Sequence, residues 1–186
     1  MSKFQQSSYR YYWFFQICFY LIPIVTFLFW LSFSKGSATS GQSSLFMQLG
    51  IGNDVMQYIH GDTVPLGTKL LAFLISMIPG GVIMYGLSQL IIVFKNYSQG
   101  NVFVYHNALA YKKLGYTLFA WVIGGLIYDA LISVVLSFAN PPGQRVLTLS
   151  LSGIDFVSLI TGAVVILIAK VMQQAQQLEE ESHLTI

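Results

Sequence analysis

The stretch LLAFLISMIPGGVIMYGLSQLIIVF, residues 70–94, decides the fold because it contains no charged side chain. A helix needs about 20 predominantly apolar residues to cross a hydrocarbon core of roughly 30 Å. This stretch is therefore long enough for one membrane crossing, and it predicts that lipid surrounds this part of the chain.

Three further segments are almost free of charge. Residues 11–34 carry none, residues 114–144 carry only Asp129, and residues 146–169 carry only Asp155. Alternating segments of about 10 residues, typical of a membrane β-barrel, are not found. The sequence therefore predicts an all-α integral membrane protein whose four transmembrane helices cover residues 11–33, 69–94, 114–139 and 150–172.

These spans divide the rest of the chain into an outer loop of residues 34–68, an inner loop of residues 95–113 and a tail of residues 173–186. They leave no room for a second domain, so residues 1–186 are expected to form a single membrane domain. The short turn near Pro141 and Pro142 connects the third and fourth spans, since proline cannot continue a helix.

Composition excludes several classes of protein. The chain is 55% hydrophobic and 9% charged, whereas an ordinary soluble domain is roughly 25% charged. So few charges cannot cover the surface of a water-soluble protein. The net charge of +2 does not provide the concentrated basic face that direct nucleic-acid binding requires. The expected environment is a lipid bilayer.

The basic residues predict the orientation. Four crossings place both termini on the same side of the membrane as the inner loop, and basic flanks are retained in the cytoplasm. That side carries Lys3, Arg10, Lys95, Lys112, Lys113 and Lys170, and the other side carries Lys35, Lys69 and Arg145. Both termini are therefore expected in the cytoplasm.

Asp129 is the most costly residue of the predicted spans. An aspartate in the middle of a membrane helix costs about 2.5–3.5 kcal/mol on insertion scales and normally faces the interior of the protein. Gly125, Asp129, Ser133 and Ser137 recur every four residues, which gives the third span one small, polar stripe. Such stripes let membrane helices pack closely and share hydrogen bonds.

Asp155 lies near the start of the fourth span, and Arg145 in the preceding turn is expected to reach one of the two aspartates. Two interpretations remain open. Asp129 and Asp155 bind a proton, a cation or a ligand, or they are structural groups that hold helices together.

Catalysis has little support in the sequence. Cys18 lies within the first span and is the only cysteine, so it has no partner for a disulfide within the chain. No Ser-His-Asp order, metal motif or phosphate-binding loop is present. His60 and Asp62 are too few for a metal site. No enzymatic activity, catalytic residue, metal or cofactor is therefore predicted.

The inner loop and the tail carry two short motifs. In the loop, Phe94, Tyr97, Gly100 and Phe103 are spaced three apart, and Asn107 and the run Lys112-Lys113-Leu114-Gly115 follow. Asn107 is expected to be the N-cap of the helical run into the third span. The tail is LEEESHLTI, residues 178–186. Together the two motifs resemble a bacterial four-helix membrane family catalogued as domain of unknown function 2975.

This resemblance implies a multi-pass protein of the bacterial inner membrane with no assigned activity. Members are often encoded beside a small helix-turn-helix regulator, which implies a cytosolic or membrane protein partner. The expected interaction surface comprises Gly100, Phe103, Asn107, Glu179 and Glu180. A contact between the tail and the inner loop of the same chain would explain the same residues.

Two hypotheses of different classes follow. The first is a non-enzymatic sensor or anchor that acts through its cytoplasmic surface. The second is a small transporter, a channel component or a toxin-immunity protein that uses the region around Asp129. Small-residue stripes also permit a homo-oligomer.

Overall fold

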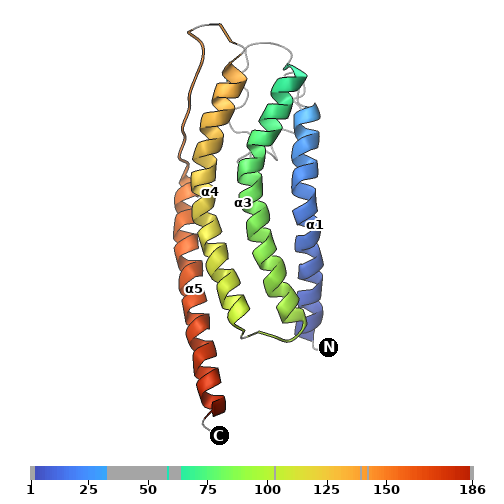
Figure 1. The fold of residues 1–186 in the computed structure, drawn as a ribbon, viewed down its shortest axis with the longest axis vertical. Coiled ribbons are helices and arrows are strands. Elements are labelled where there is room, and N and C mark those ends of the chain that lie inside the picture. Colours follow the sequence, from blue (N-terminus) through green and yellow to red (C-terminus); the bar gives the residue numbers. More distant parts are fainter. Residues whose placement is uncertain are drawn as a thin grey trace. The chain divides into compact units, whose positions relative to one another are not determined.

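A computed structural model describes residues 3–32, 58, 64–102, 104–138, 140–141 and 143–184, with side chains as far as Leu178 at the C-terminal end. Its long helices are α1 (Lys3–Ser32), α3 (Leu66–Ser98), α4 (Tyr105–Ser137) and α5 (Gly153–Leu184) (Figure 1). The described residues include no strand. All four helices are long and apolar enough to cross a membrane, so the prediction of four membrane-spanning helices in an all-α chain is confirmed at that level.

Each helix extends beyond its predicted span at the end on the side of the inner loop and the tail, and α1 already begins at Lys3. The connection between α3 and α4 shortens to residues 99–104, and α5 continues through the glutamine-rich stretch to Leu184. Gln, Leu and Glu are good helix formers, so nothing in this sequence stops the helix where the apolar run ends. Most of the outer loop, including the His60–Asp62 turn, lies outside the described residues.

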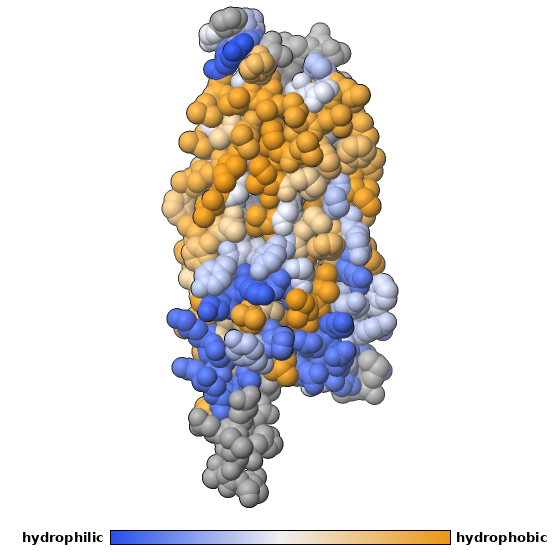
Figure 2. All heavy atoms as spheres, in the orientation of Figure 1, coloured by the Kyte–Doolittle hydropathy of each residue, from blue (hydrophilic) through white to orange (hydrophobic). Residues whose placement is uncertain are grey.

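Large apolar side chains lie on the outside of the helices. Phe14, Leu74, Ile123 and Ile160 are each more than half exposed, whereas Ser76 and Ser133 are fully buried. Figure 2 shows apolar side chains over the helices and hydrophilic ones gathered near the connection between α3 and α4. Membrane helices pack through small and polar residues and turn their apolar faces to lipid. The distribution points to a multi-pass membrane protein.

The chain divides into two compact units. The first comprises Met1–Leu21, Gly81–Ile123 and Ser152–Ile186, and the second comprises Ile22–Gly80 and Gly124–Leu151. Helices α1, α3 and α4 contribute to both units, whereas α5 belongs to the first.

Close contact between two glycines joins α4 to α5 in the first unit. A Cβ atom built on Gly115 would lie 2.9 Å from the carbonyl oxygen of Gly162, and one built on Gly162 would lie 3.0 Å from that of Gly115. The first distance is shorter than real Cβ contacts and the second is tighter than most of them, so these backbones approach as closely as they do because neither residue has a side chain. The two helices lie side by side there (Figure 1).

A buried tryptophan organises the second unit. Trp30 Nε1 on α1 donates a hydrogen bond to Ser76 Oγ on α3 at 2.9 Å, and that hydroxyl donates to the Ala72 carbonyl at 2.8 Å. The Phe27 and Phe73 rings meet edge to face beside it, 5.3 Å apart. The indole N–H therefore has a partner within the apolar core, where an unpaired donor would be costly.

Candidate functional site

A non-helical segment, residues 144–152, binds the polar stripe of α4 in the second unit (Figure 1). The Val146 amide donates to Ser137 Oγ at 3.2 Å, and the Thr148 amide donates to Ser133 Oγ at 3.1 Å. The Ser150 hydroxyl donates to the Asp129 carboxylate. These three hydrogen bonds form a ladder, which we call the serine ladder.

The spacing of the serine ladder has a geometric cause. Four residues along an α-helix rise about 6.0 Å, and two residues of extended chain rise about 6.6 Å. A stripe of period four on a helix therefore matches every second residue of an extended segment beside it. This match allows one helix face to bind the segment over three consecutive steps.

The serine ladder gives the polar stripe of α4 a structural role. Backbone N–H groups inside a bilayer have no water to bind, so non-helical chain needs partners from the protein. Ser133 and Ser137 are fully buried and supply those partners. Ser133 and Ser137 thus accept hydrogen bonds from the chain's own connecting segment, rather than from the neighbouring helices that the sequence suggested. Their hydroxyls also donate to the Ala130 and Val134 carbonyls of α4, and Asp129 is bonded in the same ladder.

Asp155 has a different position and a different task. Its carboxylate oxygen accepts hydrogen bonds from the Ser152 amide at 2.7 Å and from the Ser152 hydroxyl at 2.9 Å. A serine followed three residues later by an acid is the capping-box pattern, in which the acid binds the amide of the N-cap residue. Asp155 therefore closes the first turn of α5.

Arg145 stacks on an aromatic ring. Its guanidinium carbon lies 4.8 Å from the centroid of the Phe138 ring, within the range of a cation–π contact. No ion pair joins Arg145 to Asp129 among the described residues. Within that part of the chain, no three His, Cys, Asp or Glu side chains lie together as a metal site would require.

Asn107 organises the connection between α3 and α4 in the first unit. Its Oδ1 accepts a hydrogen bond from Asn96 Nδ2 at 2.7 Å. Its Nδ2 donates to the carbonyls of Asn101 at 2.9 Å and Val102 at 2.8 Å. The side chain is fully buried, so one side-chain amide fixes two points of the connection and joins them to Asn96 on α3.

The prediction that Asn107 is an N-cap is wrong. Helix α4 begins two residues earlier, at Tyr105, and the Asn107 amide donates to the Val104 carbonyl at 2.9 Å. Side chains in a helix tilt toward its N-terminus, so a residue in the first turn reaches back over the preceding connection. The side-chain amide of Asn107 therefore donates to the carbonyls of that connection instead of capping its own helix.

Gly100 ends α3. It has a φ of +87°, its amide donates to the Tyr97 carbonyl, and the Asn101 amide donates to the Asn96 carbonyl. This pair of bonds is the Schellman motif, which places glycine in the left-handed conformation just after a helix. The connection is thus closed on the α3 side by Gly100 and on the α4 side by Asn107.

A contact between α3 and α4 and a contact of α3 with α1 fix the same end of the first unit. The hydroxyls of Tyr97 and Tyr111 lie 3.0 Å apart, and the Phe4 and Tyr97 rings are 5.8 Å apart. Of the predicted surface residues, Gly100 and Asn107 are brought together in this connection. Phe103 lies outside the described residues, and Glu179 and Glu180 continue the backbone of α5 with side chains that are likewise not described.

Sequence reasoning missed the partners of these residues. Asn96, Ser150 and Ser152 each bind a predicted site residue. Ser152 could have been found, because Ser-x-x-Asp before an apolar run is the capping-box signature. Asn96 and Ser150 could not, since their partners are distant in sequence and no local pattern connects them.

Comparison with known proteins supports the resemblance found in the sequence. The model of a family described as a protein of unknown function (DUF2975) matches residues 56–186, a range that includes α3, α4 and α5. No curated protein and no solved structure gives a significant match. Because the family model covers well over half of the chain, this protein belongs to the DUF2975 family.

Proposed function

We propose that this protein is a non-enzymatic anchor or sensor in the bacterial inner membrane, with both termini in the cytoplasm. In this proposal its interaction surface comprises the α3–α4 connection and the C-terminal part of α5. The partner is a cytosolic protein, with a helix-turn-helix regulator as the first candidate. The excess of Lys and Arg on that side supports the orientation.

The observation that carries the proposal is the construction of the α3–α4 connection. A short connection between two membrane helices needs only a turn, yet this one is fixed by a Schellman motif and by the three hydrogen bonds of Asn107. A surface that is already ordered loses little conformational entropy when a partner binds. The connection therefore has the properties of a preformed binding surface.

The tail supports the same proposal. Helix α5 continues to Leu184, about 18 Å beyond residue 172, where the predicted span ends. Gln174 and Gln177 are exposed on this extension, and the sequence continues with Glu179, Glu180 and Glu181. An acidic helix complements a basic protein surface, and DNA-binding regulators carry such surfaces.

Removing residues 178–186 is the test. We expect the truncated protein to remain in the membrane after carbonate extraction and to lose the cytosolic partner that the full chain captures in crosslinking pull-downs. A matched variant replaces Glu179, Glu180 and Glu181 by Gln, which keeps helix length and removes the charge. Capture of the regulator at the full-chain level by both variants would refute the proposal.

The same experiment separates a partner from an intramolecular contact. A photo-crosslinker at position 180 yields a product of higher mass if the tail binds another protein. A tail that binds the exposed Lys112 or Lys113 on α4 of its own chain yields an internally crosslinked chain of unchanged mass. We expect the product of higher mass.

The transport hypothesis has a separate test at Asp129. Its carboxylate is half-buried and accepts a hydrogen bond from Ser150 in the serine ladder, an arrangement that satisfies the group without a transported ion. We expect wild-type protein and Asp129→Asn to give the same proton and cation flux as empty liposomes. Flux through the wild type that disappears in Asp129→Asn would establish the transport hypothesis instead.

The toxin-immunity hypothesis is tested with the same variant. Unchanged protection of cells by Asp129→Asn would argue against toxin immunity through Asp129.

A further inference from the structure

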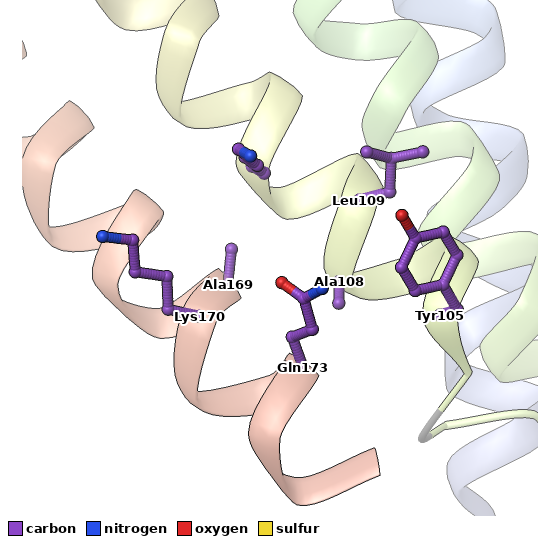
Figure 3. A pocket seen from close by; sticks show the side chains of 7 residues that line it. Tyr105, Ala108, Leu109, Ala169, Lys170 and Gln173 are labelled. Carbon is purple, nitrogen blue, oxygen red and sulfur yellow. The ribbon is translucent and has the colours of Figure 1, made fainter. Parts of the chain in front are cut away.

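A cavity opens between α4 and α5 at the end of the first unit that carries the connection (Figure 3). Its volume is about 110 Å³. In Figure 3 the Gln173 amide extends from α5 toward Ala108 on α4. The lining residues are Tyr105, Ala108, Leu109 and Lys112 from α4 and Ala169, Lys170 and Gln173 from α5.

The polar groups of the cavity suit an anion. Of the lining residues, Lys112 and Lys170 carry ammonium groups at the ends of long side chains, Gln173 carries amide N–H groups, and Tyr105 carries a hydroxyl. These are hydrogen-bond donors, and two of them are cationic. Among the residues that the structure describes, no carboxylate lines the cavity beside the two lysines.

The small side chains keep the cavity open. Ala108 and Ala169 are almost completely buried, at 5% and 3% exposure, and they line the space where larger residues would fill it. The volume is enough for a compact group such as a phosphate and far too small for a whole lipid.

The position of the cavity along the helices identifies the source of the anion. Lys112 lies two residues before the apolar run of α4, which starts at Leu114, and Lys170 lies at the end of the apolar run of α5. Both lysines therefore lie where a membrane helix passes from hydrocarbon to water, which is the depth of lipid headgroups. Leu167 and Val171, on either side of Lys170 on α5, are 61% and 57% exposed and provide apolar surface for acyl chains.

We infer that this cavity binds the phosphate of an anionic phospholipid headgroup, held by Lys112 and Lys170 with Gln173 and Tyr105 as further donors. Basic pockets between membrane helices on the cytoplasmic side are suited to this class of ligand. The inference is independent of any protein partner.

The experiment measures lipid binding by native mass spectrometry of the full chain released from detergent, with phosphatidylglycerol and phosphatidylcholine as probes. We expect phosphatidylglycerol to bind preferentially. We expect the double variant Lys112→Gln/Lys170→Gln to bind it about 30-fold more weakly, since each interfacial lysine contributes about a factor of five. Binding should also weaken as salt is added.

A matched control removes the same number of charges outside the cavity. Lys95 and Lys113 belong to the same unit but do not line the cavity, so Lys95→Gln/Lys113→Gln should retain wild-type affinity. Ala169→Val narrows the cavity without changing its charge and should also weaken binding. All variants are first checked for a monodisperse elution profile, and Ala169→Val and the lysine variant provide independent tests if one fails to fold.

Three results would overturn the inference. Equal losses in the two lysine double variants would show that net charge alone attracts the lipid. Equal binding of phosphatidylcholine would show that the cavity does not select an anionic headgroup. Binding of inorganic phosphate with the affinity of phosphatidylglycerol would identify a site for free phosphate instead.

Discussion

Gly115→Ala lowers the stability of the protein in detergent, with an expected loss of about 1–3 kcal/mol in the free energy of unfolding. The new Cβ would lie 2.5 Å from Ile166 Cγ1 and 2.9 Å from the Gly162 carbonyl oxygen. A χ1 rotation can move Ile166 Cγ1, although this angle is restricted for a β-branched residue in a helix, but the carbonyl belongs to the backbone of α5. The two helices must therefore separate, which weakens the packing on which membrane helices depend. Gly162→Ala should act in the same way.

Gly125→Ala is the matched control on the same helix. A Cβ there has no other atom within 4 Å, and alanine is a better helix former than glycine by about 0.5–1 kcal/mol. The control should therefore leave stability unchanged or raise it slightly. The stability of both variants is measured by thermal unfolding, with circular dichroism as the signal. Equal stability of Gly115→Ala and Gly125→Ala would show that the close approach of α4 and α5 is not needed.

The double variant Ser133→Ala/Ser137→Ala removes the acceptors of the serine ladder. The Val146 and Thr148 amides would then lose the hydrogen bonds that the described residues give them. These hydrogen bonds are only partly buried, but in a bilayer no water replaces them. An unsatisfied donor there costs about 1–3 kcal/mol, so the expected loss is about 2–6 kcal/mol if the segment cannot rearrange. If it detaches, the two amides exchange their hydrogens faster, which hydrogen exchange detects directly.

Ser158→Ala is the control for this pair. Ser158 Oγ donates to the Ile154 carbonyl of its own helix at 2.9 Å, so its removal leaves no backbone N–H without an acceptor. We expect little change in unfolding and none in the exchange of residues 146 and 148. If the double variant retains wild-type stability and protection at both amides, the serine ladder has no structural role.

The four helices could be predicted from the sequence because crossing a bilayer sets requirements that each segment must meet by itself. A segment that crosses a bilayer must be apolar over a fixed length, and its backbone must satisfy its own hydrogen bonds. Both requirements can be seen in a single stretch such as residues 70–94. The ends of the helices were less predictable: α5 begins at Gly153, three residues after the predicted start of its span, where Ser152 and Asp155 close its first turn.

Membership of the family was also predicted from short local motifs in the sequence. Gly100, Asn107 and the acidic tail stand in a recognisable order along the chain, and the family match confirms it. The pattern did not show why Asn107 is placed there. Its role depends on the Asn101 and Val102 carbonyls and on Asn96, which come together only when α3 and α4 are joined by a short connection.

Sequence alone thus predicted a lipid environment for this protein, four helices long and apolar enough to span a membrane, and the costly position of Asp129. Tertiary structure decided what the polar residues bind: Ser133, Ser137 and Asp129 bind an extended segment, and Asp155 binds Ser152. The physical reason is that burial in lipid depends on the composition of each segment. A hydrogen bond depends on two groups meeting within about 3 Å, and those meetings are set by how the chain folds back on itself.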